Sequence, residues 1–97
     1  MDVGCGAGSL LDMTKGVTKK QLGIEPCQPY RKALISKGFT VFHDLQEATS
    51  LHKNTIDYAF SIQVIEHVIN PRKFLENIKS LMKPGGSILL STPNREE

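Results

Sequence analysis

Short apolar segments alternate with helix-like segments along the whole chain, and this alternation constrains the fold more than any other feature. Strands are expected over 1–3, 21–25, 39–43, 55–62 and 87–92. Helices are expected over 9–15, from Pro29 to the stop at Gly38, and over 70–83, with a weak helix or a loop over 46–54. Strands separated by helices form right-handed βαβ units, so the chain is predicted to be an α/β protein with a parallel sheet. The expected strand order is 3-2-1-4-5, with helices on both faces.

The helix expected over 70–83 has the clearest pattern. Asn70 suits the N-cap and Pro71 suits the first helical position, where a missing N–H costs nothing. An apolar stripe at helical spacing follows, formed by Phe74, Leu75, Ile78, Leu81 and Met82. Lys83 is expected to complement the helix C-terminus, and Pro84-Gly85-Gly86 to end the helix before the last strand.

The composition is that of one ordinary globular domain, predicted to span residues 1–97. No apolar run approaches the roughly 20 residues that cross a bilayer, so no membrane span is expected. The net charge is only +2, and basic pairs such as Arg31 and Lys32 are interpreted as solvated surface. Nucleic acid is therefore not an expected partner.

The two cysteines, Cys5 and Cys27, have no further metal-ligating side chain at a suitable spacing. We expect no metal site. A disulfide framework is not expected either, because the chain has enough apolar residues for an ordinary core. The resulting prediction is a reduced, cytoplasmic protein.

A glycine-rich turn formed by Gly4, Gly6 and Gly8 follows the first expected strand. Glycine has no Cβ, so a ligand can approach the backbone, and the next helix directs its N-terminal amides to the same place. A tight turn without a ligand is the alternative interpretation. The spacing is G-x-G-x-G, whereas a dinucleotide fingerprint requires its third glycine where Ser9 stands, which disfavours a nicotinamide cofactor.

Two acidic residues come at the ends of neighbouring strands, where parallel sheets bind their ligands. Glu25 ends the second strand and can accept hydrogen bonds from ribose hydroxyls, or it is simply a solvated acid. Asp44 ends the third strand and can accept from an adenine amino group, or it caps the turn that follows. The residues alone leave both pairs of alternatives open.

Five segments together carry a family resemblance: DVGCGAG, GIEP, the HD after the third strand, IDYAFSIQVIEHV and LMKPGGSILLSTPN. In this order and spacing, from Asp2 to Asn94, they resemble the successive motifs of class I S-adenosylmethionine-dependent methyltransferases. The closest branch is the one that contains ubiquinone- and menaquinone-type methyltransferases. The resemblance implies a Rossmann-like fold lacking strands six and seven, and a chain that is the cofactor-binding core of a larger enzyme.

The resemblance also implies where S-adenosylmethionine, or its product S-adenosylhomocysteine, would bind. The methionine ammonium group would lie near Asp2 and the ribose hydroxyls at Glu25. The adenine would lie beside Asp44 and Leu45. The full implied set of cofactor-binding residues is Asp2, Gly4, Cys5, Gly6, Gly8, Glu25, Pro26, Asp44, Leu45, Ser61, Ile62 and Gln63.

The predicted function is methyl transfer to a small-molecule acceptor, with O- or C-methylation favoured over N-methylation. Such transfer needs alignment and exclusion of water more than acid–base chemistry. His67 is the candidate general base, although a packed or capping histidine is the favoured interpretation. The alternative function is a non-catalytic module that binds the cofactor. The last expected strand would be an exposed edge that offers pairing with a second copy of the chain.

Overall fold

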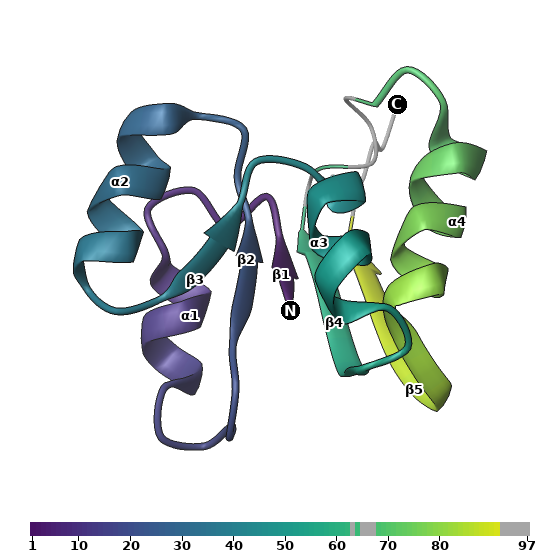
Figure 1. Ribbon diagram of the computed structural model, residues 1–97, viewed down its shortest axis with the longest axis horizontal. Coiled ribbons are helices and arrows are strands. Elements are labelled where there is room, and N and C mark those ends of the chain that lie inside the picture. The colour runs from purple at the N-terminus through teal and green to yellow at the C-terminus, as the bar shows by residue number, and fades with distance from the viewer. Residues whose placement is uncertain (63, 65–67, 92–97) are drawn as a thin grey trace, which may run out of the picture.

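A single parallel sheet organises the protein, and its five strands run in the order β3-β2-β1-β4-β5 (Figure 1). The computed structural model describes residues 1–62, 64 and 68–91. The strands are β1 (Asp2–Val3), β2 (Leu22–Ile24), β3 (Thr40–Phe42), β4 (Ile56–Ile62) and β5 (Met82–Ser91). The strand order confirms the sequence prediction. It places β1 at the centre of the sheet, where Asp2 lies opposite Gly23 on one side and Phe60 on the other.

Four helices connect the strands: α1 (Ser9–Thr14), α2 (Gln28–Ser36), α3 (Leu45–His52) and α4 (Pro71–Leu81). Figure 1 shows α1 and α2 beside β2 and β3, and α3 and α4 grouped together nearer β4 and β5. In the described part of the chain no helix is long and apolar enough to cross a membrane.

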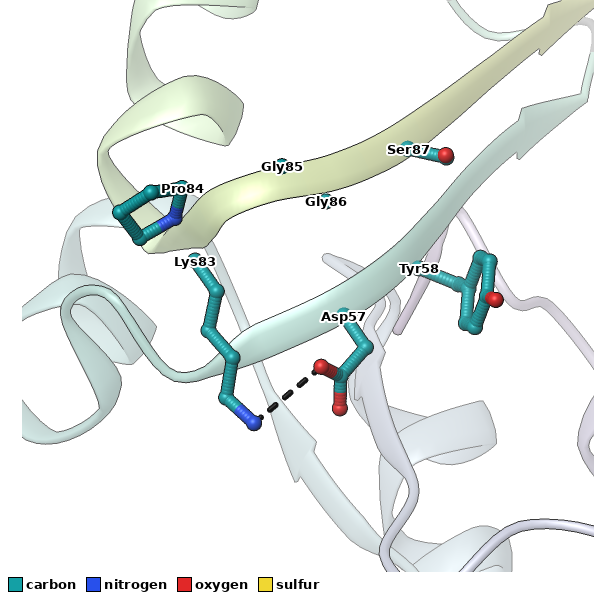
Figure 2. Close-up of a pocket in the computed structure, with 7 residues that line it drawn as sticks. All are labelled: Asp57, Tyr58, Lys83, Pro84, Gly85, Gly86 and Ser87. Carbon is teal, nitrogen blue, oxygen red and sulfur yellow. Dashed lines mark ion pairs between the residues drawn. The ribbon is translucent and has the colours of Figure 1, made fainter.

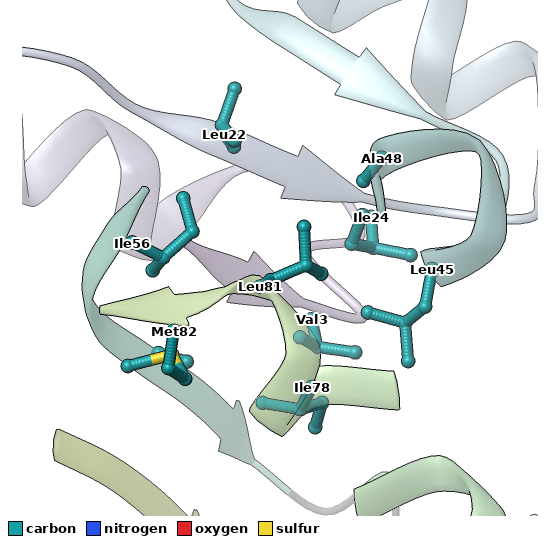
Figure 3. Packing of buried hydrophobic residues seen from close by; sticks show 10 residues of the cluster. Val3, Leu22, Ile24, Leu45, Ala48, Ile56, Ile78, Leu81 and Met82 are labelled. Atoms are coloured by element: carbon teal, nitrogen blue, oxygen red, sulfur yellow. The ribbon is translucent and has the colours of Figure 1, made fainter. Parts of the chain in front are cut away.

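Two clusters of buried side chains show that the helices cover both faces of the sheet. The larger cluster joins β1, β2, β4 and β5 to α3 and α4, with Ile78 and Leu81 fully buried at its centre (Figure 3). The smaller cluster joins β3 to α1 and α2 and contains Cys5, Leu11, Leu34, Phe39 and Val41. The sheet is therefore sandwiched between helices, as the sequence predicts.

The boundary between α4 and β5 differs from the prediction. The helix ends at Leu81, and Met82 is already extended and pairs with Ile56. Lys83 does not complement the helix end but forms an ion pair with Asp57, at 3.1 Å. The Pro84-Gly85-Gly86 segment lies inside β5, at an irregularity in the register with β4. A Cβ at Gly86 would lie 3.0 Å from the Asp57 carbonyl, so glycine allows the two strands to approach here.

Most of the segment 46–54, expected as a weak helix or a loop, lies in the regular helix α3. Its N-terminus has reciprocal capping. The Asp44 carboxylate accepts from the Glu47 N–H at 2.8 Å, and the Glu47 carboxylate accepts from the His43 N–H at 3.0 Å. This arrangement resembles a capping box, and it satisfies backbone donors that would otherwise lack partners at the start of the helix.

Candidate functional site

The glycine turn after β1 is tied to the end of β2 by three backbone N–H groups. The amides of Gly4 and Cys5 both donate to the Ile24 carbonyl, at 2.7 and 3.1 Å. The amide of Gly6 donates to the Glu25 carboxylate at 2.7 Å. The turn and the strand-end acid are therefore one hydrogen-bonded unit at the carboxyl edge of the sheet, where α/β proteins bind ligands.

The three glycines of the turn have different surroundings, although all have positive φ, between 54° and 90°. A Cβ at Gly4 would meet the Val64 side chain at 2.5 Å, and a Cβ at Gly8 would collide with the Leu34 side chain. A Cβ at Gly6 would meet no atom within 4 Å. Gly4 and Gly8 thus allow the protein to pack against itself, whereas Gly6 faces open space that a ligand can enter.

Glu25 is largely buried and each of its carboxylate oxygens accepts a hydrogen bond, so it is not simply a solvated acid. One carboxylate oxygen accepts from the Gly6 N–H, and the other accepts from the Cys27 N–H at 2.9 Å. Each carboxylate oxygen can accept about two hydrogen bonds. Both oxygens therefore retain an acceptor position for a further donor, such as a hydroxyl group of a ligand.

Asp2 precedes the glycine turn and Cys5 lies within it, and both residues are buried. Burial is the largest effect on Asp2 and raises the pKa of its carboxyl above the usual value. Burial also raises the pKa of the Cys5 thiol to about 11, so this thiol remains protonated at neutral pH. Among the described residues, no group of three or more metal-ligating side chains could hold an ion.

Asp44 and Leu45 stand at the next strand end and have structural roles. Asp44 caps α3, and its second carboxylate oxygen lies 2.9 Å from His43 Nε2. Leu45 is buried in the larger core cluster. The capping alternative for Asp44 is therefore confirmed, while contact of these residues with adenine stays a prediction.

Ser61 and Ile62 end β4, beside the start of the glycine turn. Ser61 is fully buried, and its hydroxyl has no hydrogen-bond partner among the described residues. Ile62 is 44 % exposed at the strand end. The predicted site residues Gln63 and His67 lie outside the described residues.

A hollow between β4 and β5 does not belong to this site. Its volume is about 170 Å³, and Figure 2 shows that Asp57, Tyr58 and the Lys83–Ser87 segment line it. It lies near the beginning of both strands, away from the carboxyl edge of the sheet. Its two charges, on Lys83 and Asp57, already pair with each other.

Two residues that sequence reasoning did not select help to build the site. Val64 packs over Gly4, a contact that only the path of the chain after β4 creates. Arg31, interpreted as solvated surface, is partly buried and donates from Nη1 to the carbonyls of Glu25 and Pro26, at 2.9 and 2.7 Å. No motif signals this contact, because it depends on how α2 is rotated against the turn.

Comparison with known proteins places this geometry in a family. The family model described as a methyltransferase domain matches residues 1–97. The chain is 33 % identical to a ubiquinone biosynthesis O-methyltransferase of Pectobacterium atrosepticum, over 98 % of this chain and 42 % of the relative. It is 32 % identical to the enzyme of that name from Actinobacillus pleuropneumoniae, over 98 % of this chain and 45 % of the relative.

A solved structure shares the fold. The crystal structure of the PH0226 protein from Pyrococcus horikoshii matches with a TM-score of 0.71 and 22 % sequence identity. The match covers 92 % of this chain and 46 % of that protein. Our chain therefore spans less than half the length of these three proteins.

Proposed function

This chain belongs to the methyltransferase domain family, and from that premise we propose that it binds S-adenosylmethionine at the glycine turn. The methyl group would pass to a small-molecule acceptor, and S-adenosylhomocysteine would remain. The relatives named above are O-methyltransferases, which favours an oxygen acceptor over nitrogen. The residue range 1–97 would form the cofactor-binding core domain.

The single observation that carries the proposal is the Glu25 carboxylate bound to the Gly6 amide. A nucleoside placed over Gly6 would meet no side chain there, and its ribose hydroxyls could donate to the free acceptor positions of Glu25. The residues thus fit the cofactor in two independent respects: space at Gly6 and unused acceptors at Glu25.

The other proposed contacts follow from position. Asp2 would interact with the methionine ammonium group, because its carboxylate lies at the base of the turn. Asp44 would accept from the adenine amino group through the carboxylate oxygen that does not cap α3. The remaining proposed contacts are Gly4, Cys5, Gly8, Pro26, Leu45, Ser61, Ile62 and Gln63.

When bound, the cofactor supplies an electrophilic methyl group on a sulfonium. The chain's own residues would orient the bound molecule, chiefly through Glu25 and Asp2, and keep water from the methyl group. Proximity and alignment then supply most of the rate enhancement. His67 would act as a base if the acceptor must lose a proton.

Calorimetric titration of the chain with S-adenosylhomocysteine tests the proposal, with Glu25→Gln as the matched variant. We expect binding in the micromolar range by the wild-type chain and at least tenfold weaker binding by the variant. Absence of binding by a chain shown to be folded by circular dichroism would contradict the proposal.

The second candidate function is a module that binds the cofactor without transferring methyl groups. It is supported by the same contacts at Gly6 and Glu25, because these contacts concern the cofactor and not the acceptor. Both functions require cofactor binding. Transfer of a labelled methyl group to a quinone-precursor phenol separates them, because the binding module would leave the phenol unlabelled.

We also propose a reducing, cytoplasmic setting and association through β5. In the described structure Cys5 and Cys27 are free thiols, one buried and one exposed, which suits a reducing compartment. β5 is an edge strand with exposed apolar side chains, which suits pairing with a second copy.

A further inference from the structure

We propose that Arg31 is a positioning residue that sets the affinity of the site for ribose by fixing the main chain of Glu25. The inference rests on the proposed function, because it concerns the same nucleoside. It assigns a role to a residue that no motif marks and that is not among the proposed ligand contacts.

The contact of Arg31 is specific. A single nitrogen, Nη1, donates to two consecutive carbonyls, those of Glu25 at 2.9 Å and Pro26 at 2.7 Å. These carbonyls lie in the short turn that joins β2 to α2. The guanidinium thus holds two successive peptide groups of the turn in one orientation.

With this contact, every hydrogen-bonding group of Glu25 has a partner. Its N–H donates to the Phe42 carbonyl of β3 at 2.9 Å, and its carbonyl accepts from Arg31. Its two carboxylate oxygens accept from the amides of Gly6 and Cys27. The carboxylate can point at a ligand only while this backbone stays in place. Among the residues that the structure describes, Arg31 is the one side chain that donates to that backbone.

The location of Arg31 argues against a general stabilising role. It lies in the first half of α2, near the positive end of the helix dipole, where a cation is disfavoured. A guanidinium nevertheless suits this contact, because it is planar, permanently charged and carries paired donors in a fixed geometry. The hydrogen bonds to the two carbonyls therefore explain why a positively charged side chain occupies this position near the start of α2.

The test compares Arg31→Gln with Lys32→Gln, which removes the same charge from the exposed neighbouring position. Calorimetry measures the affinity of each for S-adenosylhomocysteine and for an analogue that lacks the ribose hydroxyls. We expect Arg31→Gln to lose roughly tenfold in affinity for S-adenosylhomocysteine, as for one charge-assisted hydrogen bond. Its affinity for the analogue should equal that of wild type, and Lys32→Gln should bind both ligands normally.

A double-mutant cycle with Glu25→Gln provides the second readout. Adding Arg31→Gln to Glu25→Gln should cause no further loss of affinity, because Arg31 acts through the carboxylate. Equal losses for both ligands, or additive losses in the cycle, would overturn the inference. So would wild-type affinity in Arg31→Gln.

The outcomes also separate this inference from the proposed function. If the folded wild-type chain does not bind S-adenosylhomocysteine, both fail. If wild type binds and Glu25→Gln weakens binding while Arg31→Gln does not, this inference alone fails. If Arg31→Gln does not fold, Arg31→Lys provides the test, because an ammonium lacks the fixed paired donors of a guanidinium. A several-fold loss of affinity in Arg31→Lys supports the inference. Wild-type affinity in Arg31→Lys overturns it.

Discussion

The glycines of the turn are required for different physical reasons, and substitution by alanine separates them. Gly6→Ala should cost about 1–2 kcal/mol of folding stability, since only its positive φ is unfavourable to alanine. Gly8→Ala should cost about 2–5 kcal/mol, because its Cβ also collides with Leu34. Urea denaturation measures both free energies of unfolding.

The affinity of Gly6→Ala for S-adenosylhomocysteine provides a second test. In Gly6→Ala the added methyl group occupies the open space above the turn, so affinity for S-adenosylhomocysteine should fall at least tenfold although the protein remains folded. Normal affinity in Gly6→Ala would show that the ligand does not lie over this glycine.

Asp2 makes stability depend on pH. Burial raises the pKa of its carboxyl above 3.8 in the folded protein, so the folded state keeps a proton that the unfolded state releases. The stability that the protonated Asp2 carboxyl contributes is therefore present at low pH. It is lost as pH rises from the pKa of the unfolded state to the higher pKa of the folded state. Asp2→Asn should gain stability relative to wild type as pH rises from below 3.8 towards neutrality. Urea denaturation of both proteins across this pH range tests the prediction. Free energies of unfolding that differ by the same amount at every pH would contradict it.

At the scale of single elements, Asp44 caps α3, and we also propose that it contacts adenine. Asp44→Asn keeps an oxygen that can accept from the Glu47 N–H, so stability should change by less than about 0.5 kcal/mol. Asp44→Ala removes the cap and should cost about 1 kcal/mol. Both variants lose the second carboxylate oxygen, the one near His43 Nε2 that is proposed to accept from adenine.

The two variants therefore separate capping from binding. Both should bind S-adenosylhomocysteine more weakly than wild type by calorimetry, although only Asp44→Ala is less stable in urea. If Asp44→Asn binds as wild type does, Asp44 is a cap and nothing more.

Element boundaries show where sequence reasoning succeeds and fails. The strand order was predictable, because helices between short apolar strands permit few arrangements. The start of β5 could not be predicted, because Met82 continues the apolar stripe of α4 in the sequence and yet pairs with Ile56 as a strand residue. The regularity of α3 was detectable, since Asp44 and Glu47 have the spacing of a capping box.

The parts of the candidate site that stand at the end of a strand could be predicted from the sequence. Glu25 and the glycine turn fall at the same edge in any parallel sheet of this order. The packing of Val64 on Gly4 and the contact of Arg31 with the Glu25 carbonyl depend on side-chain direction across separate elements. No local pattern contains that information.

At the scale of the whole molecule, the sheet ends in an apolar edge. Leu89 on β5 is 54 % exposed, and on the neighbouring strand Tyr58 is 63 % exposed. The register of β4 with β5 puts both side chains on the same face of the sheet. Among the described strands β5 has a neighbour on one side only, and such an edge beside an exposed apolar surface favours association.

Charge introduced at this edge should therefore control the oligomeric state. In sedimentation velocity, the wild-type chain should associate as its concentration rises. Leu89→Lys should remain monomeric, because a charged side chain on an edge strand opposes association. Leu51→Lys is the matched control, since Leu51 is also exposed but lies on α3. It should associate like wild type. Equal association of both lysine variants would place the contact elsewhere, whereas a monomeric wild type would show that this edge alone does not bind a second copy.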